Sequence, residues 1–279
     1  MFNWKNKKVF VTGSEGMIGK ELVKLLEGKK AKVVKIDTRI NKLYDITEKM
    51  TTESLIEYLD IDYIFHLAGI KGNPKITEEK PVDFMGPMLQ FDTNMILAAQ
   101  KYRVKRVLYT SSIAVENPES DFYPAWAKMT AEKLIDAMRI QYPEGTKYCI
   151  VRPSNVYGKE DLSRDNLMVV SSLIKFGKEN KKLILDKKGM IQERDVIHAK
   201  DVARGMIKAM EKMPQQPVNL CSGKATKIKD IAEEIAKQMN VKIEYRDLNM
   251  VLGPQKKIMS NPYIKPKVTL KQGIKECLK

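Results

Sequence analysis

The stretch VFVTGSEGMIG, residues 9–19, decides the fold of this 279-residue chain. The apolar run Val9 to Val11 is typical of a buried strand. Glycines follow at 13, 16 and 19, and an apolar pattern at helical spacing begins at Ile18. Strand, glycine turn and helix in this order place a pyrophosphate at a helix N-terminus. The alternative is an ordinary strand-to-helix turn with no ligand.

Each glycine has a separate expected role. Gly13 allows the tight turn, Gly16 lets the backbone approach the phosphates, and Gly19 lets the helix lie close to the strand. We count the first helical residues, Met17 and Ile18, with these glycines as dinucleotide-binding. The stretch therefore predicts a dinucleotide site.

The composition excludes several classes of protein. The chain is 43% hydrophobic and 30% charged, enough for one large α/β domain or one domain with an added lobe. No apolar run approaches the roughly 20 residues that span a bilayer. The first residues lead directly into the first strand, so we expect no signal peptide, no membrane segment and a cytoplasmic protein.

The net charge of +15 raises nucleic acid as a partner, but its distribution argues against one. The lysines are spread along the chain among acids, and no basic and aromatic residues alternate as a stacking platform requires. We interpret them as solvated faces that also attract an anionic substrate. Three scattered cysteines and two histidines predict neither a disulfide framework nor a metal site.

An acid ends the predicted second strand, residues 31–36. In this position Asp37 accepts hydrogen bonds from the adenosine ribose and repels a 2′-phosphate, which favours NAD over NADP. Arg39 lies two residues further on and offers a phosphate ligand instead, so NADP stays the less favoured alternative.

Strands and helices alternate to residue 158, which predicts a doubly wound parallel sheet of the Rossmann type. Residues 43–47 are expected to form a short strand and turn, and residues 70–87 a long loop. We expect a dinucleotide-binding domain over 1–158, with its sheet completed by 190–222, and a smaller α/β substrate-binding lobe over 159–279. Ligands bind where such strands end; those ends carry Gly13, Asp37, Gly69, Ser111, Ser112 and Asn155.

These pieces resemble the extended short-chain dehydrogenase/reductase family, the NAD-dependent nucleotide-sugar epimerases and dehydratases. The resemblance covers nearly the whole chain. Its motifs are TGSEGMIG at 12–19, DI at 45–46, HLAGIK at 66–71, TSS at 110–112, RPSNVYG at 152–158 and RDVIH at 194–198.

The resemblance implies a site for each motif. The implied dinucleotide-binding residues, besides those of the glycine stretch and Asp37, are Asp45, Ile46, Leu67, Ala68, Gly69, Lys71, Ser111, Lys128, Pro153, Asn155 and Val156. The implied substrate-binding residues are Ser112, Asn155 and Arg194, with Arg194 on a diphosphate. The partner implied is a nucleotide-sugar, and a homodimer is expected through the helices at about 88–102 and 125–140.

The family's chemistry uses a tyrosine as base and a lysine four residues later, since such residues share a helix face. Lys128 falls into register, but the tyrosine position is Pro124. Tyr123 lies one residue early, about 140° off the lysine's face on a continuous helix. If proline begins the helix, Tyr123 precedes it and acts as a displaced base; the alternative is a packing tyrosine. A second departure is Met88, where the family usually has an asparagine.

The expected function is NAD-dependent epimerisation or 4,6-dehydration of a nucleotide-activated sugar, with Ser112, Tyr123 and Lys128 as the catalytic set. The alternative is a member with altered or lost chemistry that binds NAD as a sensor or scaffold. Structural interpretations also stay open: the serines as caps, Arg194 as an ion-pair partner and His198 as a hydrogen-bonded core residue.

Overall fold

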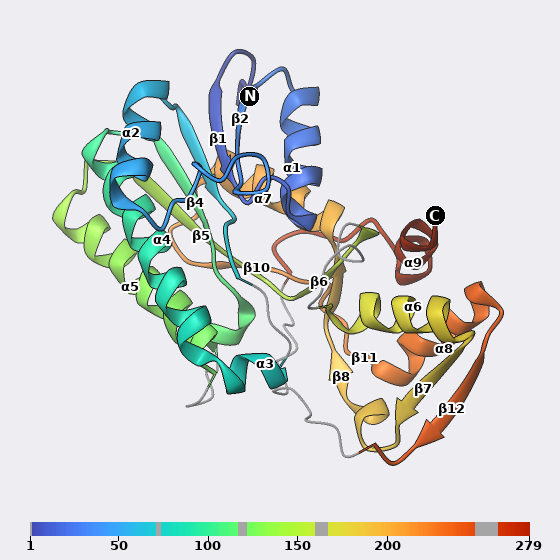
Figure 1. The fold of residues 1–279 in the computed structure, drawn as a ribbon. Helices are drawn as coiled ribbons and strands as arrows, with labels where there is room; N and C mark the ends of the chain where they lie inside the picture. Colours follow the sequence, from blue (N-terminus) through green and yellow to red (C-terminus); the bar gives the residue numbers. More distant parts are fainter. Residues whose placement is uncertain (1, 71–73, 117–121, 160–166, 249–261) are drawn as a thin grey trace.

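Six parallel strands form the central sheet, in the order β10-β5-β4-β3-β1-β2 (Figure 1). The computed structural model describes residues 2–70, 74–116, 122–159, 167–248 and 262–279. The strands of this sheet are β1 Lys8–Thr12, β2 Lys32–Ile36, β3 Tyr63–His66, β4 Arg106–Thr110, β5 Lys147–Pro153 and β10 Val218–Leu220. This confirms the predicted α/β fold with a doubly wound parallel sheet.

Helices cover both faces of the sheet (Figure 1). One face carries α1 Met17–Gly28 and α7 Ala199–Lys212. The other carries α2 Lys49–Leu59, α4 Pro81–Lys101 and α5 Tyr123–Gln141.

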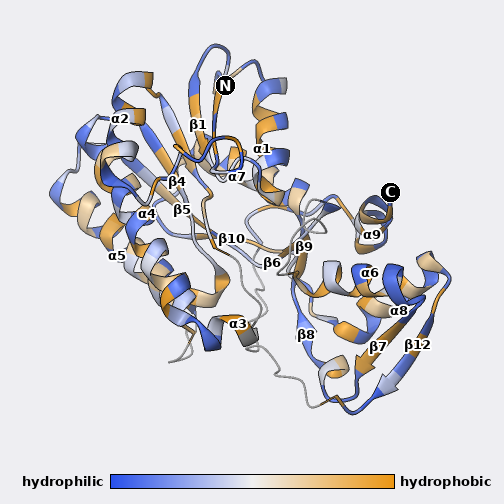
Figure 2. Cartoon of the chain, in the orientation of Figure 1, coloured by the Kyte–Doolittle hydropathy of each residue, from blue (hydrophilic) through white to orange (hydrophobic). Residues whose placement is uncertain are grey.

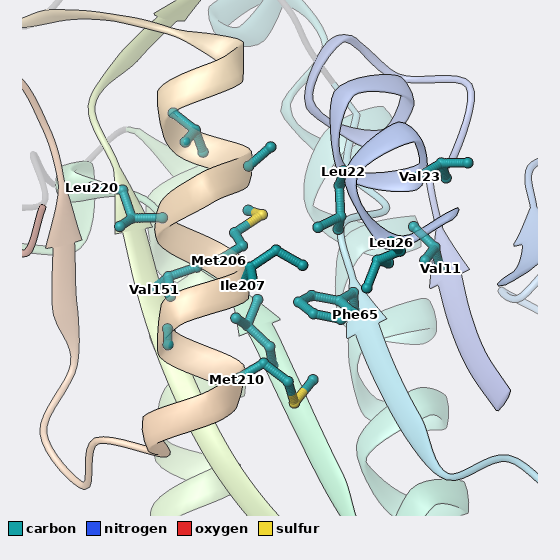
Figure 3. Packing of buried hydrophobic residues seen from close by; sticks show 14 of the residues in the cluster. Val11, Leu22, Val23, Leu26, Phe65, Val151, Met206, Ile207, Met210 and Leu220 are labelled. Carbon is teal, nitrogen blue, oxygen red and sulfur yellow. The ribbon is translucent and has the colours of Figure 1, made fainter. Parts of the chain in front are cut away.

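Alternation along the strands builds two cores. Val9 and Val11 pack with α1 and α7, whereas Phe10 between them packs with α4 and α5. Figure 3 shows Met206 and Met210 of α7 reaching toward the side of the sheet that carries Phe65. In Figure 2, α1 carries hydrophobic residues on one side and hydrophilic residues on the other.

A smaller lobe follows the sheet (Figure 1). The lobe has a hydrophobic core of its own, separate from the two cores of the sheet. This core joins the lobe's helices to a two-stranded parallel ribbon formed by β7 and β12. The lobe's elements are α6 Val169–Asn180, β7 Lys182–Asp186, α8 Ile228–Met239, β12 Lys242–Arg246 and α9 Leu270–Leu278. The chain crosses between the two bodies more than once, because α7 and β10 return to the sheet.

Short elements connect these bodies. Strand β6 pairs with β9, and β8 pairs with β11. The remaining bounds are α3 Pro74–Glu79, β6 Asn155–Tyr157, β8 Glu193–Arg194, β9 Val196–His198, β11 Thr226–Lys227 and the 3-10 helices η1 Ile113–Glu116 and η3 Gly189–Ile191. No helix in these described ranges is long and apolar enough to cross a bilayer.

Three local expectations were wrong. Residues 43–47 form turns, because Asp45 Oδ1 accepts from the Thr47 backbone N–H (3.0 Å) and hydroxyl (2.7 Å), a local pattern that competes with a strand. Residues 81–87 are helical: Pro81 begins α4, where a missing N–H costs nothing. Tyr123 is the first residue of α5 and does not precede it.

Candidate functional site

A cavity of about 850 Å³ lies where β1, β2, β3 and β4 end. It is lined by residues from all four strand ends and from the starts of α1 and α5. The predicted residues in its wall are Gly13, Gly16, Met17, Ile18, Gly19, Asp37, Asp45, Ile46, Leu67, Ala68, Gly69, Ser111, Ser112, Lys128 and Pro153. Lys71 lies outside the described residues.

The glycine loop closes tightly against its neighbours. Gly13 has φ +63°, and a Cβ there would lie 3.0 Å from the Leu67 carbonyl oxygen. A Cβ on Gly19 would lie 2.2 Å from the Gly13 oxygen. Gly16 precedes α1, and no side chain caps this helix. The first-turn N–H groups of α1 are therefore left for an anionic ligand in the cavity.

The β2 side of the cavity carries an ion pair. Asp37 accepts hydrogen bonds from Arg39 Nε (2.7 Å) and Nη2 (2.6 Å) and from the Glu15 backbone N–H (3.1 Å). Burial disfavours the charged carboxylate, but the hydrogen bonds from Arg39 outweigh it and hold the pKa of Asp37 below its usual value. A charged acceptor and a cation thus share the expected adenosine-ribose position.

The β4 side of the cavity carries hydroxyl groups. Ser111 Oγ and Thr110 Oγ1 are buried and have no hydrogen-bond partner among the described residues. Ser112 Oγ accepts from the Ala114 backbone N–H (3.2 Å), so it caps the following turn, as one of the open interpretations has it. Buried hydroxyls without partners at the cavity wall are suited to a polar ligand.

Lys128 lies in the wall and pairs with a buried acid. Its Nζ is 3.2 Å from Asp92 Oδ2 and 3.4 Å from Oδ1, and Asp92 is 1% exposed. The ammonium also lies over the ring of Tyr109, 4.8 Å from its centroid. Sequence reasoning missed Asp92. The available signal was an acid inside the apolar stripe of α4, between Phe91 and Met95.

Asp92 accepts hydrogen bonds from two further buried groups. Tyr109 donates its hydroxyl to Oδ2 (2.6 Å), and His66 Nε2 lies 2.9 Å from Oδ1. Burial disfavours the charged form of Asp92, but Lys128 and these two donors outweigh it, so the pKa of Asp92 is lowered. Burial and the carboxylate raise the pKa of Tyr109 well above 10.0.

The His66 tautomer follows from its second contact. Thr12 Oγ1 accepts from the backbone N–H groups of Leu67 and Ala68, both at 3.0 Å. Its own proton is therefore available to His66 Nδ1, 2.8 Å away. We assign the imidazole proton to Nε2, which donates to Asp92. Burial lowers the pKa of His66, so the ring is neutral. The network thus connects the cavity wall at 67–68 to Lys128.

Tyr123 lies apart from the other predicted catalytic residues. Its neighbours Phe122 and Pro124 line the cavity, but Tyr123 does not belong to the wall and its side chain is 39% exposed. Because α5 is continuous from Tyr123, the five-residue offset to Lys128 turns the phenol about 140° away from the lysine. This geometry favours the interpretation of Tyr123 as a tyrosine outside the reaction.

Asn155, Val156 and Arg194 also lie outside the described wall of the cavity. Asn155 donates its amide to the Asp195 carbonyl oxygen (3.0 Å). Arg194 is buried on β8 and donates to Gln192 Oε1 (2.7 Å) and to the Glu193 carbonyl oxygen (2.8 Å). Asn155 and Val156 belong to β6, which pairs with β9, and Arg194 belongs to β8, which pairs with β11.

The geometry of the cavity fits a dinucleotide. The uncapped start of α1, the tight glycine contacts and the buried hydroxyls without partners match a pyrophosphate flanked by two polar ends. Within the described ranges, no three His, Cys, Asp or Glu residues gather as metal ligands. Cys149, Cys221 and Cys277 are buried and unpaired with one another.

A family model described as the NAD dependent epimerase/dehydratase family matches residues 9–221. The chain belongs to this family. The match spans every strand of the central sheet, which agrees with the resemblance seen in the sequence motifs. The family is one of nucleotide-sugar epimerases, dehydratases and reductases that depend on NAD or NADP.

Curated relatives of this epimerase/dehydratase family member have several activities. GDP-L-fucose synthase 1 of Arabidopsis thaliana is 24% identical over 98% of this chain and 92% of its own length. GDP-L-colitose synthase of Yersinia pseudotuberculosis is 25% identical over 96% and 95%. The solved UDP-glucose 4-epimerase of Thermotoga maritima, crystallised with UDP-glucose, has the same fold, with a TM-score of 0.85, 20% identity and 97% of each chain covered.

Proposed function

We propose that this protein binds NAD and a nucleotide-activated sugar and that it epimerises or 4,6-dehydrates the sugar through transient hydride transfer. One observation carries the proposal: a single cavity joins the uncapped start of α1 to Lys128 and the hydroxyls at the end of β4. Two relatives, GDP-L-fucose synthase and GDP-L-colitose synthase, are synthases of nucleotide-linked sugars, which supports the substrate class.

Each part of the cavity has a proposed task. The N–H groups at the start of α1 bind the pyrophosphate. Lys128 binds the nicotinamide ribose, and Ser112 orients the reacting sugar hydroxyl. The dinucleotide supplies the hydride acceptor and donor. Arg194 and Asn155, which lie outside the described wall of the cavity, are proposed to contact the substrate diphosphate and sugar.

We propose NAD as the preferred dinucleotide because Asp37 is charged and buried at the ribose position. A carboxylate there accepts from two ribose hydroxyls and repels a 2′-phosphate. Arg39 already donates twice to this carboxylate, so NADP binding would require the ion pair to open.

A second candidate function is dinucleotide binding without turnover, as a sensor or scaffold. Pro124 favours it, because proline occupies the position where the family resemblance expects the base, and Tyr123 does not reach the cavity wall. Proline at position 124 leaves the residues at the α1 end of the cavity as the dinucleotide site requires them.

Two measurements separate the candidates. Calorimetric titration with NAD and NADP tests binding, and ultraviolet absorbance of reduced nicotinamide with NMR of the sugar tests turnover on UDP-, GDP-, dTDP- and CDP-sugars. Saturable NAD binding with conversion of one sugar supports the enzyme. Tight NAD binding without conversion of any sugar supports the second candidate. Absence of binding to both dinucleotides contradicts both proposals.

A matched pair of variants controls the turnover assay. Lys128→Met removes the proposed ribose ligand, and Lys133→Met removes an exposed lysine from the same helix. The enzyme proposal predicts that only the change at 128 lowers turnover. Equal rates in the two variants would exclude Lys128 from the reaction.

A further inference from the structure

Two polar side chains of helix α4 contact residues that line the two ends of the dinucleotide cavity. We infer that Asp92 and Asn94 are positioning residues that fix these ends separately: Asp92 holds Lys128 at the nicotinamide end, and Asn94 holds residues 46–47 at the adenosine end. The inference rests on the proposed function in one respect, because it requires that the cavity takes a dinucleotide.

Asp92 determines where the Lys128 ammonium lies. A lysine side chain has four rotatable bonds and gains a fixed position only from its contacts. Here the carboxylate contacts Nζ with both oxygens, at 3.2 and 3.4 Å, and is itself held by Tyr109 and His66. Lys128 is 7% exposed, so few alternative positions in water are open to it. The carboxylate also neutralises the lysine's charge.

Asn94 determines where the adenosine-side segment lies. Its Nδ2 donates to the carbonyl oxygens of Ile46 (3.2 Å) and Thr47 (2.8 Å). Both residues line the cavity beside Asp45, and the segment has no strand to hold it. The Asn94 amide, together with the Thr52 hydroxyl, which donates to the same Ile46 carbonyl oxygen (3.0 Å), thus takes the place of strand pairing. Asn94 itself does not belong to the described wall, so it acts through residues 46–47.

The two residues act independently because of their helical spacing. Positions two apart on a helix differ by about 200°. Asp92 therefore faces β3, β4 and α5, whereas Asn94 faces the segment that follows β2. Among the described residues, the two side chains have different hydrogen-bond partners, so each is expected to act on its own end of the cavity.

The experiment uses ADP and NAD as probes in calorimetric titrations of the full chain. ADP carries the adenosine and diphosphate but lacks the nicotinamide ribose. Asp92→Asn is expected to lower the affinity for NAD about tenfold, which corresponds to the loss of one hydrogen bond to a charged group. The affinity for ADP is expected to stay within about twofold of that of the unmodified protein. Asn94→Ala, which adds no charge, is expected to weaken ADP and NAD by the same factor, about three- to tenfold.

Two control variants make the same kinds of substitution at other positions of the chain. Asp83→Asn removes an exposed acid from the first turn of α4. Asn180→Ala removes an exposed amide that also donates to a main-chain carbonyl, in the smaller lobe. Both controls are expected to leave the two affinities unchanged. Tyr109→Phe, which removes one donor to Asp92 and keeps the ring, is the second variant if Asp92→Asn does not fold, and it is expected to weaken NAD alone.

The outcomes separate this inference from its alternatives. If the Asp92 carboxylate affected binding only through its charge, its loss would increase the affinity for both ADP and NAD, because both probes are anionic. If Asp92 were merely structural, both affinities would fall together with the melting temperature. Either result overturns the role of Asp92, and unchanged ADP affinity in Asn94→Ala overturns that of Asn94. If the unmodified protein binds neither probe, the proposed function fails, and this inference fails with it.

Discussion

Replacing Gly19 by alanine should separate the glycine loop from α1. An added Cβ would lie 2.2 Å from the Gly13 carbonyl oxygen and 2.8 Å from Ser14 Cα, and both atoms belong to the backbone. Backbone atoms cannot rotate away as a side chain can. The contact must therefore open from 2.2 Å to at least 3.0 Å, which moves the loop or the start of the helix.

The structure sets the size of the effect. Forcing extra atoms into a packed site costs about 1–3 kcal/mol, and each kcal/mol lowers Tm by about 2–4 °C in a protein near this size. A displaced loop also loses at least one N–H contact to the pyrophosphate. A hydrogen bond to a charged group contributes about 1.5–3 kcal/mol, so NAD affinity should fall about tenfold or more.

Gly28→Ala is the matched control, because Gly28 ends the same helix and a Cβ there meets nothing within 4 Å. Alanine has the higher helix propensity, so this variant should be as stable as the unmodified protein or up to about 1 kcal/mol more stable. Thermal unfolding and calorimetric NAD titration measure both quantities. Wild-type stability and affinity in Gly19→Ala would refute the close approach of loop and helix.

Three further predictions follow from the site. Asp37→Ala should release Arg39 for a 2′-phosphate and raise the ratio of NADP to NAD affinity at least about tenfold, measured by paired titrations; an unchanged ratio would contradict this role. Tyr123→Phe should leave turnover within about twofold, as should the similarly exposed Tyr142→Phe, whereas loss of a true base costs about a hundredfold or more. Burial lowers the pKa of both histidines, so as pH falls the unfolded chain binds protons before the folded protein does. The free energy of unfolding measured with urea should therefore fall below about pH 6.5, by at most about 1.4 kcal/mol per pH unit for each ring. His66→Gln should reduce this slope, and an equal slope in the variant would exclude a contribution from the His66 ring.

The sequence was sufficient to predict the sheet and many of the residues that line the cavity at its strand ends. Residues 9–19 carry strand, glycines and helix start in one local segment, and local segments are what spacing arguments describe best. Asp37 follows its strand directly, so its place at the sheet edge followed from the topology. The return of residues 218–220 to the sheet agrees with the expected completion by 190–222.

The buried network could not be predicted in the same way. Thr12, His66, Asp92 and Lys128 come from four elements, and only their packing shows that they form one chain of hydrogen bonds. An acid within a helix is ordinarily read as solvated. Its position in an apolar stripe was the one local sign that it is buried.

Prolines are found at two of the three wrong local expectations. Pro81 and Pro87 suggested a loop, yet Pro81 occupies the start of α4 and Pro87 lies within it at the cavity wall. Pro124 similarly lies in the first turn of α5, which begins one residue earlier, at Tyr123. The expected homodimer and the assignments of Asn155, Val156 and Arg194 stay predictions, which sedimentation and ligand titration of their variants test.

The central claim is that the cavity at the ends of β1 to β4 takes a nicotinamide dinucleotide. A calorimetric titration of the unmodified protein with NAD, repeated in the presence of saturating ADP, tests it most directly. The account predicts saturable binding of one NAD per chain, which ADP abolishes by occupying the α1 end of the cavity. Absence of binding, or NAD binding that ADP leaves unchanged, would contradict it.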